Sequence, residues 1–174
     1  MRFRLGAHDD RGMNTIQRTV QRVAASRPGG TFFRVTGIGA QDRLVNRMTG
    51  GRATVTGVFA GFPTVFVTTT GARTGRAHTV ALIAVGDPER PGRLGLIASN
   101  FGQSHDPDWC RNLRASREAT VADGRGDERA YSCEEVTGAA RDRWFALADD
   151  LYLGYPAYRE RAGRTIPVFE LTPK

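Results

Sequence analysis

The sequence predicts an α+β fold that is mainly β: a small barrel of about six antiparallel strands with helices around it. Runs of β-branched and aromatic residues begin at residue 64 and recur as far as residue 171. Short glycine-rich segments join these runs, and they suit hairpins rather than the long crossovers that parallel strands need. One strongly amphipathic helix is expected late in the chain, over residues 138–153. The 174 residues suffice for one main domain.

The N-terminal third has a different pattern from the rest. Residues 1–12 are polar, and a helix is expected from the N-cap Asn14 to the Pro-Gly-Gly stop at 28–30. A second short helix is expected around residues 44–48, before Gly50. We therefore expect residues 1–50 to form a polar tail and a helical arm, and residues 51–174 to form the barrel domain. The arginines of the arm make it a candidate for weak contact with an anionic membrane.

The first half of the barrel domain is predicted to form a β-meander. Residues 64–70, 78–85 and 94–99 are rich in valine, threonine, isoleucine and leucine, and each run predicts one strand. A turn is expected at 71–76 and a loop at 86–92, since both are rich in glycine, proline or polar residues. Connections this short imply antiparallel neighbours.

The second half adds helices and closes the barrel. A short helix is expected at about 108–115, followed by a hairpin of strands 120–122 and 129–136 around two glycines. The helix at 138–153 should then turn one apolar face to the barrel, and residues 166–171 predict the last strand. The apolar face of this helix consists of Trp144, Leu147, Ala148 and Leu151.

The composition narrows the function classes. The net charge is +7, and Lys174 is the only lysine, so the positive charge is almost all arginine. This fits either an arginine-rich proteome or a polyanionic partner: a nucleic acid, an anionic membrane, or a cofactor bearing phosphate and carboxylate groups. Cys110 and Cys133 have no metal-ligand spacing and are expected as free thiols in a reducing cytosol. No apolar run approaches the ~20 residues of a membrane helix, so a cytoplasmic protein is expected.

The common catalytic motifs are missing. Gly37-Ile38-Gly39 lacks the third glycine of a dinucleotide fingerprint, and no phosphate loop or Gly-x-Ser-x-Gly elbow occurs. The three histidines, His8, His78 and His105, are scattered, and no cysteine or carboxylate stands near them at ligand spacing. No metal site is therefore expected.

Three segments carry candidate chemistry. In residues 68–78, two glycines bracket a turn that bears Arg73 and Arg76, whose guanidiniums can hold an anion together with hydroxyls and free backbone N–H groups. The alternative for this segment is a plain hairpin turn with solvated arginines. In residues 98–113, a strand ends in small polar residues and a helix starts behind a proline, which also suits an anionic group. Trp109 there either lies against a flat ring or, with Leu113, packs the helix on the barrel.

The third segment, residues 152–158, brings three tyrosines together near the end of the long helix. Tyrosines can line a pocket, stack on an aromatic acceptor and donate protons from their phenol groups. The alternative is an amphipathic packing seam. None of the three segments decides the function by itself.

The segments are more specific as an ordered set. Thr-Thr-Thr-Gly-x-Arg-Thr-Gly at 68–75 is followed by Ala-Ser at 98–99, Pro-x-Trp-x-x-Asn-Leu at 107–113, Tyr-Pro-x-Tyr at 155–158 and Arg-Thr-Ile-Pro-Val at 164–168. Over residues 64–172 this series resembles the actinobacterial family of deazaflavin (coenzyme F420)-dependent nitroreductases. The resemblance implies a split β-barrel like that of flavin-mononucleotide-binding proteins, and reduced coenzyme F420 as the cofactor.

The resemblance also implies a role for individual residues. The phosphate and acidic tail of the cofactor would meet the β-turn, its ring and ribityl chain would lie along two strands, and a helix would cover one side. Tyr155 and Tyr158 would face the acceptor, with Ser99 beside the reacting ring, and Tyr158 would also contact the cofactor. The implied cofactor-binding residues are Arg73, Thr74 and His78 for the tail, Thr79, Ala81, Ala98, Ser99 and Asn100 for the ring and ribityl chain, and Asp108, Trp109 and Asn112 for the covering side.

Four positions depart from the pattern of that family. Asn100 stands where some relatives carry lysine, and His78 where some carry arginine; both changes reduce the positive charge offered to the tail. Arg161 replaces a third pocket tyrosine, and Ile83 stands where an aromatic residue can occur. The acceptor therefore need not be the nitroaromatic compounds of the best-known relatives.

The reaction implied is hydride transfer from reduced F420 to a small-molecule acceptor: a quinone, an enone or a nitroaromatic compound. The protein is expected as a monomer or homodimer. Two alternatives use the same barrel: an oxidoreductase dependent on flavin mononucleotide, and a non-catalytic protein that stores or carries F420. A nucleic-acid binder is a third, but the sequence has no recognised nucleic-acid motif.

Overall fold

The computed structural model of the protein describes residues 63–123 and 127–174. The predicted N-terminal arm, the domain boundary at residue 50 and the membrane contact expected of the arm lie outside these residues. The strands are β1 (Thr64–Thr70), β2 (Ala77–Gly86), β3 (Leu94–Ile97), β4 (Glu118–Ala122), β5 (Glu128–Val136) and β6 (Val168–Pro173). The helices are the 3₁₀ helix η1 (Asn100–Gly102), α5 (Asp108–Ser116), α6 (Gly138–Leu151) and α7 (Tyr155–Ala162).

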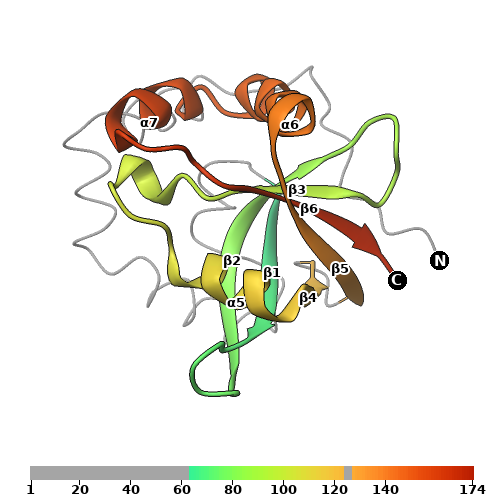
Figure 1. Cartoon of the computed structure of the whole chain (residues 1–174). Coiled ribbons are helices and arrows are strands. Elements are labelled where there is room, and N and C mark those ends of the chain that lie inside the picture. The colour runs from blue at the N-terminus through green and yellow to red at the C-terminus, as the bar shows by residue number, and fades with distance from the viewer. Residues whose placement is uncertain (1–62, 124–126) are drawn as a thin grey trace, which may run out of the picture.

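The six strands form a closed antiparallel barrel in the order β1-β2-β3-β6-β5-β4 (Figure 1). The meander β1-β2-β3 and the hairpin β4-β5 follow the predicted connections. The last strand, β6, lies between β3 and β5, and β4 pairs with β1 to complete the ring. The predicted mainly β fold, a barrel of six antiparallel strands with peripheral helices, is confirmed.

Alternation of side chains explains why these runs form a barrel. In β1, Val65, Val67 and Thr69 are buried, whereas their neighbours along the strand point outward. The register pairs Val65 with Leu82 and Val67 with Val80, so the buried faces of β1 and β2 coincide. The core is completed by apolar side chains from the other strands, which include Leu94, Leu96, Val121, Tyr131, Phe169 and Leu171.

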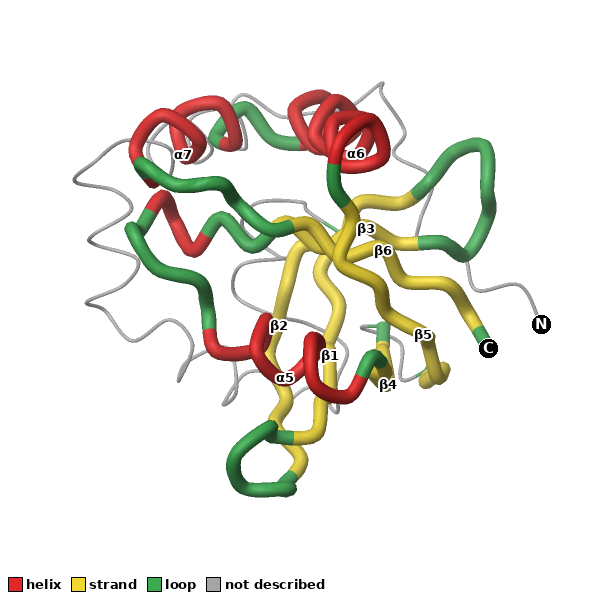
Figure 2. Tube along the Cα trace, in the orientation of Figure 1, coloured by secondary structure: helices red, strands yellow, loops and turns green. Residues whose placement is uncertain are grey.

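Helix α6 covers one end of the barrel, and α5 lies across the other side (Figure 2). Trp144 of α6 is fully buried over β3, where Gly95 leaves room for it. A Cβ added at Gly95 would lie only 2.4 Å from the Trp144 ring, so this contact requires glycine. Of the predicted apolar face, Trp144 and Ala148 are buried and Leu147 and Leu151 are half-buried. Phe145 is buried as well.

The structure corrects several predicted ends. Strand β4 begins at Glu118 rather than Thr120, and α6 ends at Leu151 rather than Leu153. Strand β3 ends at Ile97 rather than Ser99, because Ser99 already has helical backbone angles at the start of η1. Strand β6 begins at Val168 rather than Ile166, because Pro167 has no N–H group to donate to a ladder. Its carbonyl instead accepts the N–H of Ala98 at 2.9 Å.

Helix α7 is an element that the sequence interpretation missed. Pro156 occupies its first turn, where a missing N–H costs nothing, and Gly163 ends it in the left-handed conformation at φ 60°. The helix has only two turns, and its buried residues Tyr155, Tyr158 and Ala162 do not form a long apolar stripe. A short helix of this kind has little periodicity to reveal it.

Among the described residues, no helix is both long and apolar enough to cross a bilayer. The same part of the chain contains no group of three or more histidine, cysteine or carboxylate residues arranged to hold a metal ion. Cys110 and Cys133 are buried free thiols, and burial raises the pKa of each to about 12, so both stay protonated.

Candidate functional site

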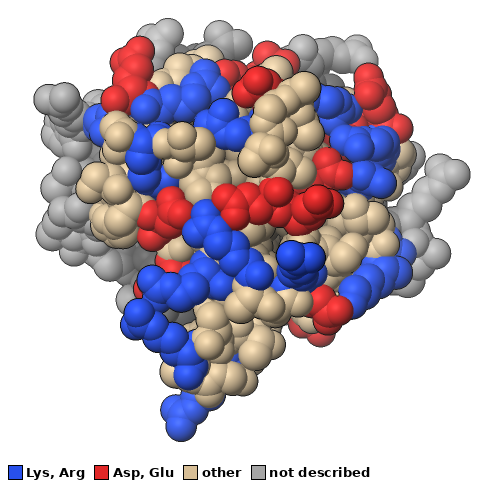
Figure 3. Space-filling view, viewed as in Figure 1, with Lys and Arg blue, Asp and Glu red and all other residues tan. Residues whose placement is uncertain are grey.

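The turn between β1 and β2 presents exposed cationic side chains. Arg73 and Arg76 are exposed, and neither guanidinium has a hydrogen bond or ion pair with another described residue. At the bottom of the space-filling view the tip of the molecule is blue, while red atoms gather across its middle and top (Figure 3). Two free guanidiniums on one turn suit a phosphate or a carboxylate.

The backbone of this turn corrects the predicted anion nest. Gly71 N–H donates to the carbonyl of Arg76, and the N–H groups of Thr74 and Gly75 both donate to the carbonyl of Gly71. The N–H of Arg76 donates to the hydroxyl of Thr74. Since four N–H groups of the turn are used within it and that of Ala72 donates to Asn112, an anion would be held here mainly by side chains.

Asn112 of α5 joins the turn to the helix. Its Oδ1 accepts the N–H of Ala72 at 3.0 Å, and its Nδ2 donates to the hydroxyl of Thr69 at 3.1 Å. Both groups of the amide are therefore used to fix the turn against α5. His78 lies over Gly71 and its Nε2 is 3.3 Å from the Thr74 hydroxyl. A Cβ at Gly71 would lie 2.7 Å from the His78 ring, so the close approach depends on glycine.

Thr79 and Ala81 lie on the outer face of β2. Their partners in the register are Thr68 and Phe66, which point away from the buried face of β1. The hydroxyls of Thr68 and Thr79 are 2.8 Å apart and form a hydrogen bond across the two strands. This strip of the barrel surface therefore combines two hydroxyl-bearing side chains with Phe66 and the small Ala81.

The end of β3 leads into a strained loop. Ala98 and Ser99 are buried, and the next three residues, Asn100, Phe101 and Gly102, all have positive φ values of 46°, 55° and 76°. A left-handed conformation costs a non-glycine residue about 1–2 kcal/mol, so two of these three residues are strained. Strain of this kind persists only where the surroundings hold it.

Three tyrosines form a cluster beside this loop. The ring of Tyr152 lies 5.4 Å from that of Tyr155 and 5.8 Å from that of Tyr158, and the hydroxyls of Tyr152 and Tyr158 are 2.8 Å apart. All three are buried, and burial raises the pKa of each phenol above its ordinary value of about 10. They are therefore neutral donors at physiological pH. Tyr152 was not among the predicted site residues, although it belongs to the same segment.

The strained loop and the tyrosine cluster are in contact. The ring of Phe101 meets the ring of Tyr158 edge-on at 6.3 Å, and Phe101 is half exposed. A Cβ at Gly102 would lie 3.3 Å from the carbonyl of Tyr158 and 3.0 Å from Cβ of Arg161, so the loop contacts α7 directly. The guanidinium of Arg161 lies 5.2 Å from the centre of the Tyr158 ring. The segments that carry Ser99 and Tyr158, predicted from separate motifs, are thus in contact through Phe101 and Gly102.

Two of the predicted residues on α5 are placed differently from each other. The Trp109 ring is buried and meets Phe169 edge-on at 5.6 Å, which is the packing alternative stated above. The Asp108 side chain is almost fully exposed and pairs loosely with Arg111 at 3.9 Å. Their contact with a cofactor stays a prediction.

Arg164 contacts the loop after β3, a role that the sequence did not reveal. In the sequence it stands only as the first residue of the motif at 164–168. Its guanidinium donates to the carbonyls of Ala98, Gln103 and His105, and so it reaches the whole loop after β3. No spacing rule connects an arginine with carbonyls about sixty residues earlier in the chain.

Comparison with known proteins identifies the family. The model of the F420H(2)-dependent quinone reductase family matches residues 40–173. The chain belongs to this family. One solved structure, an F420-H2 dependent reductase designated FDR-A, is 33% identical with a TM-score of 0.55, over 63% of this chain and 94% of that one. Another, described as a domain-swapped dimer, is 30% identical with a TM-score of 0.57, over 75% of this chain and 96% of the other.

Membership of the F420H2-dependent quinone reductase family makes the chain an F420H2-dependent oxidoreductase with coenzyme F420 as its cofactor. The resemblance inferred from the ordered motifs is confirmed at this level. Among the described residues, Arg73 and Arg76 have no carboxylate partner, which suits the anionic tail of the cofactor.

Proposed function

We propose that this F420H2-dependent reductase passes a hydride to a flat, conjugated acceptor, a quinone in the first place, beside Ser99 and the tyrosine cluster. The observation that carries the proposal is the contact between the loop after β3 and α7, where the Phe101 ring lies 6.3 Å from the ring of Tyr158, a neutral phenol of the tyrosine cluster. The quinone reductase family model supports the choice of acceptor. Enones and nitroaromatic compounds share the flat conjugated shape and are the other acceptors to compare.

The turn between β1 and β2 would hold the anionic end of the cofactor. Arg73 and Arg76 supply two guanidiniums, and Thr74 and His78 supply groups that form hydrogen bonds. Because Asn112 fixes the turn to α5, these groups are held in place before the cofactor arrives, and little ordering remains to be done on binding.

The other end of the site would hold the ring system. Bound F420H2 supplies the hydride, and the chain supplies orientation, exclusion of water and a proton. Ala98, Ser99 and Asn100 at the end of β3 would border the ring, and Thr79 and Ala81 would lie along the ribityl chain. Small side chains at these places leave room for the acceptor to approach the ring closely.

The tyrosine cluster would serve the acceptor. An acceptor that gains a hydride develops negative charge on its oxygen, and a neutral phenol can donate a hydrogen bond or a proton to it. Burial keeps the pKa of Tyr155 and Tyr158 high, so each phenol holds its proton until the acceptor needs it. The hydroxyl of Tyr152, 2.8 Å from that of Tyr158, offers a path by which the proton is replaced.

A homodimer is the assembly that we propose. It was one of the two assemblies expected from the sequence, and the relative described as a domain-swapped dimer supports it. Sedimentation of the purified protein would give the mass directly, and a monomer at micromolar concentration would exclude the proposal.

The first test is a fluorescence titration of the purified protein with oxidised F420, run beside flavin mononucleotide. We expect saturable binding of F420 and none of the flavin. Oxidation of F420H2 is then followed with a naphthoquinone, an enone and a nitroaromatic compound. Binding of F420 without turnover of the naphthoquinone would exclude the quinone proposal, and binding without turnover of any acceptor would indicate a carrier.

Variants of the tyrosines test the role of the phenols. Tyr158→Phe and Tyr155→Phe should lower kcat with the naphthoquinone by about 100-fold, the lower end of the range for a lost general acid. The dissociation constant for F420 should change little. Tyr131→Phe is the matched control, because Tyr131 is a buried tyrosine in the barrel core rather than in the cluster. Equal kcat in all three variants would show that the phenols take no part.

A further inference from the structure

Arg164 lies between α7 and β6, and its guanidinium reaches into the loop after β3. Nη2 donates to the carbonyls of Ala98 and His105, both at 3.0 Å, and Nε donates to the carbonyl of Gln103 at 3.0 Å. Nη1 is 2.8 Å from Oδ1 of Asp106. We propose that Arg164 is a positioning residue for the F420 site: it holds residues 98–106 in the conformation that receives the ring. This inference rests on the proposed place of the ring beside Ala98 and Ser99.

The bonds of Arg164 span the whole loop. Its acceptors in the loop extend from Ala98 at the end of β3 to Asp106, shortly before α5. The Arg164 side chain is only 14% exposed, so these bonds are shielded from water and are stronger than those of a surface arginine. Since every nitrogen of the guanidinium is occupied, Arg164 would act through the loop and not by touching the cofactor.

The loop has few bonds of its own. Gly102 N–H donates to the carbonyl of Ser99 at 2.8 Å, and Gln103 N–H donates to the carbonyl of Asn100 at 3.1 Å. The Asn100 amide donates to the carbonyl of His105 at 3.2 Å, which Arg164 also binds. These bonds close a turn that includes the strained residues Asn100 and Phe101. Without Arg164, the strain would favour a different conformation of the same residues.

Asp106 extends the effect of Arg164 toward the tail end of the site. Its second oxygen accepts a hydrogen bond from Arg114 of α5 at 3.0 Å, so the two arginines share one carboxylate. Arg114 is fixed in turn by Glu135 of β5 at 2.6 Å. The same helix carries Asn112, which holds the turn between β1 and β2. A single connected set of contacts therefore links the ring end and the tail end of the site.

The experiment replaces Arg164 by glutamine and follows two quantities. The first is amide hydrogen exchange of the protein without cofactor, at Gly102 and Gln103 and, for comparison, in β1. The second is the dissociation constant for oxidised F420. In Arg164→Gln we expect exchange at Gly102 and Gln103 to speed up about tenfold or more while β1 keeps its protection, because the loss of a charged donor shared by three carbonyls frees the loop. We expect the dissociation constant to rise about tenfold or more.

Arg141→Gln is the matched control. Arg141 also donates its Nε–H to a backbone carbonyl of the segment before β6, that of Ile166 at 3.1 Å, but its contacts with described residues do not include the loop. This control should lower the thermal midpoint without changing loop exchange or F420 binding. If both variants behave alike in exchange and binding, Arg164 has only a general structural role and the inference is wrong.

A second variant covers the case in which Arg164→Gln does not fold. Arg164→Lys keeps the charge but can reach fewer of the acceptors, so it should show a smaller and still local increase in loop exchange. An increase spread evenly over the barrel, or no increase, would overturn the inference. These readouts do not depend on the acceptor: the proposed quinone activity can fail while the effects on exchange and F420 binding persist.

Discussion

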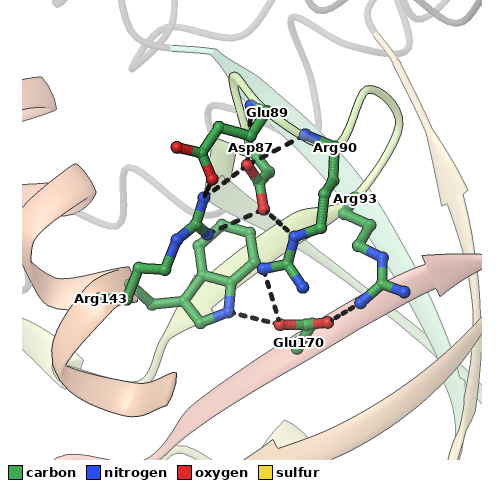
Figure 4. A network of polar contacts seen from close by, with 7 residues as sticks. Asp87, Glu89, Arg90, Arg93, Arg143 and Glu170 are labelled. Atoms are coloured by element: carbon green, nitrogen blue, oxygen red, sulfur yellow. Dashed lines mark hydrogen bonds and ion pairs between the residues drawn. The ribbon is translucent and has the colours of Figure 1, made fainter. Parts of the chain in front are cut away.

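Strand β2 has arginines near both of its ends, and the two ends use them in different ways. Beyond Gly86, the carboxylate of Asp87 is buried and bound by Arg90 at 2.6 Å and by both Nη atoms of Arg143, at 2.8 and 2.9 Å (Figure 4). Glu89 also binds Arg143, and Glu170 binds Arg90 and Arg93. Every guanidinium in this network, which joins the loop after β2 to α6 and β6, thus has a carboxylate partner.

Before Ala77, at the other end of β2, Arg73 and Arg76 have no such partner among the described residues. The comparison shows that the net charge of +7 is a poor guide to where an anion binds. Arginines that are paired within the chain stabilise the fold, and those left unpaired on an anchored turn are available to a ligand. Three predictions test this division.

The largest effect is expected from Asp87→Asn in the paired network. The substitution removes the charge that Arg90 and Arg143 share, and loss of one partner from a buried pair costs about 3 kcal/mol. The free energy of unfolding, measured in urea, should fall by this amount, while the dissociation constant for F420 should stay unchanged. Asp142→Asn is the control, since Asp142 is exposed and its ion pair with Arg141 should contribute under about 0.5 kcal/mol.

The second effect is expected at the unpaired turn. Replacing Arg73 and Arg76 together by glutamine should raise the dissociation constant for F420 by about 10-fold to 100-fold, or about 1.4–2.7 kcal/mol. The free energy of unfolding should not change, because no described contact is lost. Arg117→Gln, at another exposed arginine without a carboxylate partner, should leave F420 binding as it is. An unchanged dissociation constant in the double variant would remove the turn from the site.

The smallest effect is a change in the free energy of unfolding with pH. Arg143 holds the pKa of Asp87 well below its usual range, and Arg90 adds to this effect. A carboxyl whose pKa is lowered by folding stabilises the fold above its unfolded pKa of about 4, and this stabilisation is lost as the pH falls below that value. Between pH 5 and pH 3, protonation of Asp87 should lower the free energy of unfolding of the wild type by about 1 kcal/mol. In Asp87→Asn this contribution to the pH dependence should be absent. Parallel pH profiles of the two proteins would contradict the assignment.

Much of the fold could be predicted because its signals are local. The alternating pattern of Thr64–Thr70 and its glycine-bearing turn predicted β1 with its correct ends. Helix α6 was found from its apolar face, which Trp144 and Ala148 bury against the barrel. Helix α7 could not be found in the same way, because two turns with a proline at the start carry too little periodicity.

The same division applies to the candidate site and to the ion-pair network around Asp87. Tyr155, Tyr158 and Ser99 came from ordered motifs, and the structure brings their segments into contact. The roles of Asp87 and Arg164 depend on partners 56 and about sixty residues away, respectively, and no local pattern encodes such pairs. The hydrogen bonds within the turn could not be predicted from the sequence either, because an anion nest and a closed turn share the same glycines.

The place of β6 in the barrel has a consequence for how the chain folds. Strand β3 finds its second neighbour only in Val168–Pro173, on the far side of residues 98–167. The meander β1-β2-β3 and the hairpin β4-β5 can form early from local contacts, but the barrel closes only when β6 pairs with both β3 and β5. Until then β3 and β5 each have an open edge, which makes the half-formed barrel the species most exposed to aggregation during synthesis. Folding should therefore be slow and limited by the arrival of β6.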